Sequence, residues 1–168
     1  MHFVNLALSN RGDYVVRSAV FLARCYESGR PMKLREVSAN MCVPRTFVSQ
    51  ILGDLVHSGL AVSSFGKKGG YRLAHPPGEV SLLEVVEAAE GSLAVNGCAL
   101  GEGLPCWDTV CPLHETWGEA TAALRSVLAS TTLECLAARD QAIENGSYPV
   151  PANAHRSRTG RARSAASA

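Results

Sequence analysis

The sequence of 168 residues lacks a long hydrophobic run, a strong excess of charge and an abundance of aromatic residues. It has no stretch of about 18 or more apolar residues, so we expect no membrane span. The formal net charge is only +1, so any surface that binds nucleic acid has to be a local basic patch. The start of the chain has neither a basic segment nor a signal-cleavage pattern, and we therefore expect a cytoplasmic protein.

The sequence also has little that would serve catalysis. It shows no Ser/His/Asp arrangement, no paired carboxylates and no glycine-rich phosphate-binding loop. We therefore expect neither an enzyme nor a small-molecule substrate. The 46% of hydrophobic residues is normal for a globular protein, and the length predicts one domain or a small domain with an appended arm.

Cysteine, in contrast, occurs six times. In a reducing compartment, cysteines are ligands, redox groups or core residues more often than disulfides. Three of them, Cys98, Cys106 and Cys111, fall in the stretch CALGEGLPCWDTVCPLH, which ends at His114. The glycines and prolines of this stretch oppose regular secondary structure. Soft ligands on an irregular loop are typical of a thiophilic metal centre, so these four residues are candidate metal ligands.

A helix-turn-helix pattern lies in the first third of the chain. One helix is expected over 32–42, and Pro44 starts a second that runs to His57, before a glycine stop. Apolar positions of the second helix serve the core. Polar side chains gather near its N-terminal end, where recognition helices contact base edges. The candidate DNA-binding residues on this helix are Arg45, Thr46, Ser49 and Gln50.

A glycine-rich hairpin follows the helix-turn-helix. Strands are expected over 60–65 and 71–74, joined by the tip sequence GKKGG. A helix-turn-helix followed directly by such a hairpin is a winged helix. The wing can bring Lys67, Lys68 and Arg72 to phosphates or into a minor groove of double-stranded DNA. Charged hairpin tips are also common as solvated turns, and that interpretation stays open.

Two further helices frame the winged unit. The first, over 9–28, carries Cys25 on its apolar stripe, and we expect this thiol to be a buried structural residue. The other, over 82–90, begins with a capping box formed by Ser81 and Glu84.

A long amphipathic helix begins at Pro112, and a last short helix, on which Cys135 is expected to pack, ends at Glu144. The winged unit supplies its own core, so the apolar stripe of the long helix needs another partner. Helix-turn-helix proteins usually read two half-sites, and the stripe therefore predicts a homodimer. The stripe consists of Leu113, Trp117, Ala120, Leu124, Val127 and Leu128.

These elements predict a mainly α fold with a small β-hairpin wing, that is, a winged helix-turn-helix domain plus a long dimerisation helix. The segment after the last helix is rich in Gly, Ser, Pro, Ala and Arg and has no acid, which favours disorder. The expected parts are a DNA-binding domain at 1–91, a cysteine-rich loop at 92–111, the dimerisation helix and short C-terminal helix at 112–144, and an Arg-containing disordered tail at 145–168.

Four segments of the chain resemble the Rrf2 family of bacterial repressors: LSNRGDYVVRSAVFLA, VPRTFVSQILGDLVHSGL, FGKKGGYRLAHPPGEVSLLEVVEAAEG and CPLHETW. The resemblance covers about residues 5–144. It implies a homodimeric winged-helix regulator of transcription that binds a palindromic operator. It also implies an iron–sulfur cluster, 2Fe-2S or 4Fe-4S, through which nitric oxide, redox state or iron status controls operator affinity.

The resemblance assigns the cluster to Cys98, Cys106 and Cys111. One branch of the family takes its fourth ligand from a histidine three residues after the last cysteine, the position of His114. Another branch uses an acid near the start of the first helix of the partner subunit, the position of Asp13. From the residues alone, Asp13 is a solvated acid favoured by the helix dipole.

The sequence departs from the family pattern at two places. The gaps between the three loop cysteines are seven and four residues, whereas one branch has equal gaps. The residue before Gly66 on the wing is often arginine in the family and is Phe65 here. We therefore expect Lys67 and Lys68 to take over the phosphate contact.

Other chemistries stay open for the cysteine loop. Structural zinc sites have ligand gaps of about two to four residues, and only Cys111 and His114 show one. Three close cysteines could instead form a disulfide in a clusterless thiol-redox regulator. Cys111 before Pro112 is a dipeptide that some haem sensors use. A small iron–sulfur electron carrier is the alternative from another functional class, and the winged unit argues against it.

Overall fold

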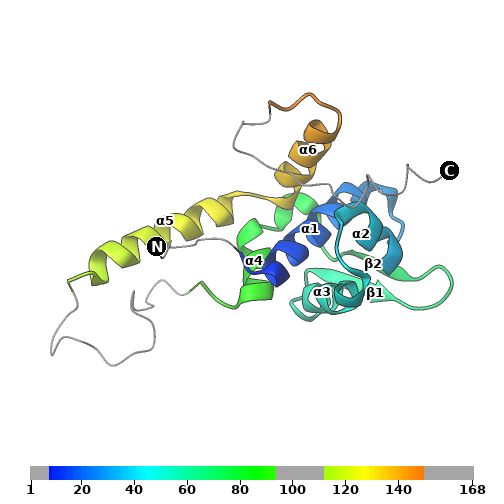
Figure 1. The fold of residues 1–168 in the computed structure, drawn as a ribbon, viewed down its shortest axis with the longest axis horizontal. Helices are drawn as coiled ribbons and strands as arrows, with labels where there is room; N and C mark the ends of the chain where they lie inside the picture. Colours follow the sequence, from blue (N-terminus) through cyan, green and yellow to red (C-terminus); the bar gives the residue numbers. More distant parts are fainter. Residues whose placement is uncertain (1–7, 94–111, 150–168) are drawn as a thin grey trace.

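The structure, a computed structural model, describes residues 8–93 and 112–149. This part of the chain is mainly helical, with one two-stranded antiparallel hairpin, as the sequence predicts (Figure 1). The elements, with η for 3-10 helices, are α1 (Asn10–Arg24), η1 (Tyr26–Ser28), α2 (Leu34–Met41), α3 (Arg45–His57), β1 (Ala61–Ser64), β2 (Gly70–Leu73), η2 (Pro77–Glu79), α4 (Leu82–Glu90), α5 (His114–Ser130) and α6 (Leu133–Glu144).

Helix α1 lies at the centre of the core, and α2, α3, α4 and α6 all pack against it. Its buried side chains, among them Val15, Ala19 and Leu22, are spaced by four and three residues and so share one face of the helix. They belong to one cluster with Ile51 and Leu55 of α3. This shared core fixes the orientation of α3, the helix predicted to contact DNA.

Helix α2 begins two residues later than the sequence predicts. Met32 was expected inside the helix, but its backbone pairs with Tyr71 of β2 through N–O distances of 2.8 and 2.9 Å in the two directions. Gly70 permits this approach, because a Cβ at its position would lie 2.5 Å from the carbonyl oxygen of Met32. The start of α2 is therefore attached to the wing, a long-range pairing that helical periodicity does not reveal.

The hairpin has the register Ala61↔Leu73, Val62↔Arg72, Ser63↔Tyr71 and Ser64↔Gly70. Ala61 and Leu73 are buried, whereas Val62 and Arg72 point to solvent, as the alternation of a strand requires. One face of the wing thus joins the core and the other stays free.

Helix α4 starts with the predicted capping box, in which Ser81 Oγ accepts from Glu84 N–H at 3.2 Å and Glu84 Oε2 accepts from Ser81 N–H at 2.8 Å. The N-cap of α6 is Thr132, whose side chain accepts from Cys135 N–H. The backbone of Leu82 donates to Thr131, so the starts of α4 and α6 are joined.

Helix α5 extends away from the hairpin end of the molecule in Figure 1 and packs against α4. None of its residues is buried. Trp117, Leu124 and Val127 on the predicted stripe are 43%, 40% and 63% exposed. Most of the stripe is therefore left uncovered by the residues that the structure describes.

The C-terminal part differs from the prediction at Cys135. This residue was predicted to pack, but its side chain is exposed because it lies on the outer side of α6. Of the tail predicted from 145 onward, the structure describes 145–149, where Ser147 and Tyr148 both donate from their backbones to Ala142. In the described ranges, no helix has the length and apolar character needed to cross a membrane.

Candidate nucleic-acid interface and ligand residues

The N-terminal half of α3 presents a polar surface. Val48, Ile51 and Leu52 face the core, which turns the intervening positions outward. All four residues predicted to contact DNA are exposed: Arg45, Thr46, Ser49 and Gln50. The first turn has no acidic residue, and the N-cap, Pro44, makes no side-chain capping bond. Free backbone N–H groups and the positive end of the helix dipole therefore face the same region.

The turn before α3 is held by specific contacts. Cys42 adopts a left-handed conformation with φ of 54° and ψ of 35°, and Val43 is buried behind it. Ser38 Oγ donates to the Val43 carbonyl at 2.7 Å. These contacts fix the angle between α2 and α3.

The wing carries its lysines at the tip. Lys67 and Lys68 are exposed in the connection between β1 and β2, and Phe65 beside them is 98% exposed. Lys33, at the start of α2, donates from Nζ to the Lys67 carbonyl at 2.8 Å. The tip is thereby attached to the helix-turn-helix. Arg72, the remaining predicted wing contact, is exposed on β2.

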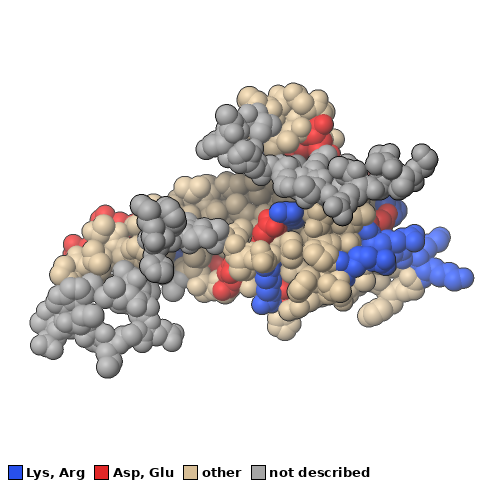
Figure 2. Space-filling model, viewed as in Figure 1, with Lys and Arg blue, Asp and Glu red and all other residues tan. Residues whose placement is uncertain are grey.

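Sequence reasoning missed a hollow between α2, α3 and the wing. This hollow has a volume of about 370 Å³. Its lining consists of Lys33, Leu34, Arg35, Arg45, Gly70 and Tyr71. Figure 2 shows that Lys and Arg side chains gather at this end of the molecule, from which the hairpin extends. Lys33 and Arg35, two basic residues at the start of the first helix of the motif, were the available signal in the sequence.

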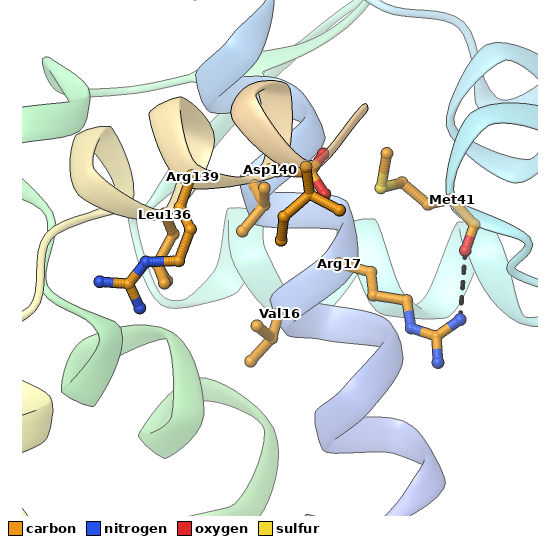
Figure 3. Close-up of a pocket in the computed structure, with 8 residues that line it drawn as sticks. Val16, Arg17, Met41, Leu136, Arg139 and Asp140 are labelled. Atoms are coloured by element: carbon orange, nitrogen blue, oxygen red, sulfur yellow. Dashed lines mark hydrogen bonds between the residues drawn. The ribbon is translucent and has the colours of Figure 1, made fainter. Parts of the chain in front are cut away.

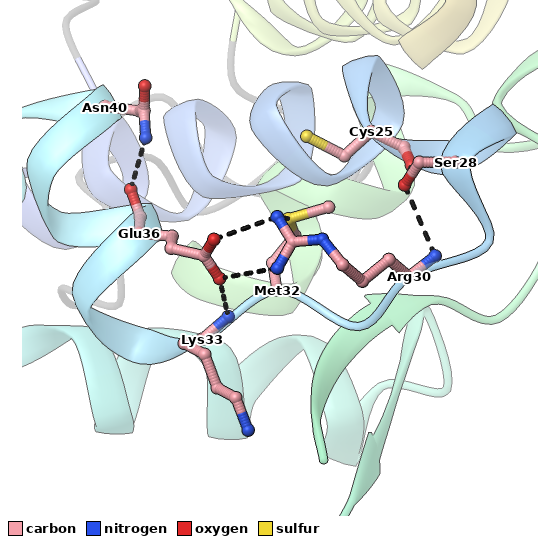
Figure 4. A network of polar contacts seen from close by, with 7 residues as sticks. All are labelled: Cys25, Ser28, Arg30, Met32, Lys33, Glu36 and Asn40. Carbon is pink, nitrogen blue, oxygen red and sulfur yellow. Dashed lines mark hydrogen bonds and ion pairs between the residues drawn. The ribbon is translucent and has the colours of Figure 1, made fainter. Parts of the chain in front are cut away.

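The acid nearest to this hollow in sequence, Glu36, is already paired (Figure 4). Arg30 donates to its two carboxylate oxygens at 2.9 and 3.2 Å, and Lys33 N–H donates at 2.7 Å. The hydrogen bond from Arg30 and its positive charge hold the pKa of Glu36 below its ordinary value. Glu36 therefore stays ionised, and Arg30 neutralises its charge.

The three predicted cluster cysteines, Cys98, Cys106 and Cys111, lie outside the described residues. His114 is the first residue of α5 and is exposed. Asp13 lies in the first turn of α1 and forms an ion pair with Arg17 at 2.7 Å. Within 8–93 and 112–149, no three His, Cys, Asp or Glu side chains form a group that could hold a metal ion.

Cys25 packs against the core, but it is half-buried and not buried as the sequence predicts. Burial raises its pKa, which keeps the thiol protonated near neutral pH. It is therefore a poor ligand in the folded protein, because metals bind the thiolate.

A polar cluster holds the last described residue before the cysteine loop. Arg125 of α5 donates from Nη1 to both Glu87 Oε1 and the Leu93 carbonyl. Leu93 N–H in turn donates to Glu87 Oε1 at 3.0 Å. Burial raises the pKa of Glu87, but the hydrogen bonds from Arg125 and Leu93 outweigh it, so the net pKa is lowered. Helices α4 and α5 thus both anchor the chain at Leu93.

The first turn of α1 joins α4 to α3. Ser9 donates to Glu90 Oε1 from its backbone N–H at 3.0 Å and from Oγ at 2.6 Å, at the end of α4. Two residues later, Arg11 forms a two-point ion pair with Asp54 of α3. The segment that carries Asp13 therefore contacts both the helix before the cysteine loop and the recognition helix.

An apolar pocket of about 240 Å³ lies between α1 and α6 (Figure 3). The charged groups of its lining are engaged within the protein. Arg17 contacts Asp13 and the Met41 carbonyl, Asp140 pairs with Arg24 at 2.7 Å, and Arg139 lies over the Tyr148 ring. A small-molecule site usually needs a few convergent polar groups to orient its ligand. The side chains of this pocket that remain available to a ligand are mainly apolar, so few groups could orient it.

Residues 8–139 match the Rrf2 family, which is described as iron-dependent transcriptional regulator. A relative in Mycobacterium tuberculosis H37Rv bears the name "Putative HTH-type transcriptional regulator Rv1287". It is 36% identical over 129 residues, which are 76% of this chain and 79% of that protein. The HTH-type transcriptional regulator IscR of Xenorhabdus nematophila is 27% identical and covers 83% of this chain and 84% of its own.

Solved structures of similar fold include CymR, the global cysteine regulator of B. subtilis. It is 25% identical, with a TM-score of 0.66, over 80% of this chain and 98% of that one. T. potens IscR has the same TM-score at 21% identity, over 88% of this chain and 95% of its own. The family match and the winged helix-turn-helix geometry lead to one conclusion: the chain belongs to the Rrf2 family and is a DNA-binding transcriptional regulator, not an enzyme.

Proposed function

We propose that the protein acts as a homodimer whose affinity for a palindromic operator is set by an iron–sulfur cluster. The observation that carries this proposal is the chain of polar contacts from Leu93, through α4 and the first turn of α1, to Asp54 on the recognition helix. It gives the cysteine loop a physical connection to the surface that meets DNA. A regulator that senses through its loop needs such a connection.

The DNA contacts fall on two elements. The exposed polar side chains of α3, from Arg45 to Gln50, read base edges in the major groove. The wing residues Lys67, Lys68 and Arg72 neutralise phosphates or enter the adjacent minor groove. The contact between Lys33 and the Lys67 carbonyl supports a wing that is positioned before DNA arrives.

The homodimer forms through the stripe of α5. An amphipathic helix with no buried residue leaves a continuous apolar surface in water, and covering it with a second copy removes that cost. Two copies then present two α3 helices to half-sites one helical turn apart. A change in the dimer angle alters operator affinity, because both helices have to fit the groove at the same time.

The cluster ligands we propose are the thiolates of Cys98, Cys106 and Cys111. Three soft thiolates fit iron, and thiol groups are the common ligands of such clusters. The candidates for the fourth ligand are His114, where α5 begins, and Asp13, which α1 presents to solvent beside Arg17. If replacing neither residue shifts the spectrum, the fourth ligand is exogenous or lies elsewhere in the chain. A bound cluster would supply a centre that reacts with nitric oxide or oxygen and is lost when iron is scarce. This chain's own residues hold the ends of the loop and transmit its position.

The clusterless thiol regulator remains the second candidate. It is favoured by the likeness to a structure described as the oxidised form of Staphylococcus aureus CymR, at 26% identity and a TM-score of 0.61. In that case the loop thiols would respond to oxidants directly, by forming a disulfide.

Visible spectra of anaerobically purified variants test the ligand assignment. Cys98→Ala, Cys106→Ala and Cys111→Ala should each abolish the chromophore, and Cys135→Ala serves as the control because Cys135 is exposed on α6. Asp13→Ala and His114→Ala, made separately, identify the fourth ligand by the one that shifts the spectrum. A colourless wild-type protein without iron or sulfide would contradict the cluster and favour the thiol regulator.

A further inference from the structure

The hollow between α2, α3 and the wing has the chemistry of an anion site. Three of its lining side chains are cationic, Lys33, Arg35 and Arg45, and no carboxylate contributes to the described lining. Converging cations that lack a counter-ion repel one another, so such an arrangement favours an anionic ligand.

The cations have little internal compensation. Neither Arg35 nor Arg45 forms an ion pair among the residues that the structure describes. The acid closest in sequence, Glu36, is paired with Arg30. Lys33 spends one of its ammonium donors on the Lys67 carbonyl and keeps two.

The backbone around the hollow is rigid. Met32 pairs with Tyr71 of β2, and Gly70 lets the two segments approach closely. Lys33 follows directly and is fixed to the wing tip. The position of Lys33 is thus set by contacts within the protein before a ligand binds, which reduces the entropic cost of binding.

We infer that this hollow binds one backbone phosphate of DNA, with Lys33, Arg35 and Arg45 as its donors. This assignment rests on the proposed function, because the phosphate belongs to the duplex that α3 and the wing contact. It adds Lys33 and Arg35 of α2 to the interface. The site fixes the register of the protein on the duplex and reads no base, since phosphates carry no sequence information.

The salt dependence of DNA binding tests the inference. The variant is Arg35→Gln, and the probes are a duplex from the protein's own promoter region and a duplex of random sequence. Losing one phosphate contact should weaken binding to both duplexes by the same factor. Each subunit of the dimer loses one contact, so the slope of log K against log salt should also become shallower by about 1.8, which is about 0.9 per phosphate. Arg35→Lys should restore the slope, because it restores the charge.

Arg139→Gln is the matched control. It removes the same charge from α6, where Arg139 lies over the Tyr148 ring and outside the hollow. Lys33→Gln is a second variant within the hollow, and thermal melts confirm that every variant is folded. Wild-type slopes in both Arg35→Gln and Lys33→Gln would overturn the phosphate site and leave DNA binding intact. No salt-sensitive DNA binding by the wild type would overturn the proposed function as well.

Discussion

Arg11 of α1 and Asp54 of α3 are joined by two hydrogen bonds, Nε to Oδ2 at 2.9 Å and Nη2 to Oδ1 at 2.8 Å. A guanidinium that holds a carboxylate at two points fixes the orientation of both groups, not only their distance. The same turn of α1 is attached to α4 through Ser9 and Glu90. The end of α4 and the recognition helix are therefore both attached to one short helical turn.

Replacing Arg11 by Gln tests this connection. We expect the variant to fold and to bind DNA, but the ratio of operator affinities with and without the cluster should fall by about fivefold or more, the usual size of a coupling between sites. Fluorescence anisotropy with labelled operator measures both affinities. Arg139→Gln is the control for charge. An unchanged ratio in Arg11→Gln would show that the signal takes another path.

The contact between Glu87 and Arg125 predicts a pH-dependent stability. The pKa of Glu87 is lowered in the folded protein, so its contribution is complete above the unfolded value of about 4.3 and is lost as the pH falls through the folded value. Glu87→Gln should cost about 1 kcal/mol at pH 7, since the pair is partly exposed, and less at pH 3. Urea unfolding at both pH values measures this. An equal cost at both would contradict the charge assignment.

The capping box of α4 predicts a local effect on stability. Ser81→Ala removes the acceptor for Glu84 N–H and should lower the free energy of unfolding by about 1 kcal/mol. Ser126→Ala, an exposed position on α5, should change it by less than about 0.5 kcal/mol. Thermal melts of both variants supply the comparison. Equal losses would mean that the cap does not stabilise α4.

The uncovered stripe of α5 predicts a variant that separates folding from assembly. Leu124→Glu places a charge in the stripe and should yield a folded monomer, because Leu124 is 40% exposed within one chain. Its operator affinity should fall by about a hundredfold, as the second half-site no longer contributes. Sedimentation analysis measures the mass. Ser126→Glu, on the opposite face of the helix, should remain dimeric, and a dimeric Leu124→Glu would move the interface elsewhere.

Local signals in the sequence were sufficient to predict the elements. The capping box of Ser81 and Glu84 and the apolar spacing of α3 each act within one or two turns, and each has the predicted role. The start of α2 was misplaced because Met32 is recruited by β2, a partner far away in the sequence. The prediction that Cys135 packs was wrong because α6 is only weakly amphipathic, so its sequence does not show which face of the helix packs against the core.

The candidate site was only partly predictable for the same reason. The apolar positions of α3 face the core, so the sequence also predicts that the polar residues between them are exposed. The pairs formed by Ser9 with Glu90, Arg11 with Asp54, and Arg125 with Leu93 join segments that only the fold brings together. Charged residues on helix surfaces are usually solvated, so nothing in the sequence separated these from their neighbours.

Operator binding by the anaerobic protein, measured with and without its iron, tests the central claim most directly. Native mass spectrometry of the same sample gives the iron, sulfide and subunit content. We predict a dimer that carries iron and sulfide in each subunit, and an operator affinity that changes by about tenfold or more when the cluster is removed. Equal affinity in the two forms, or a folded DNA-binding dimer that never carries iron and sulfide, would contradict it.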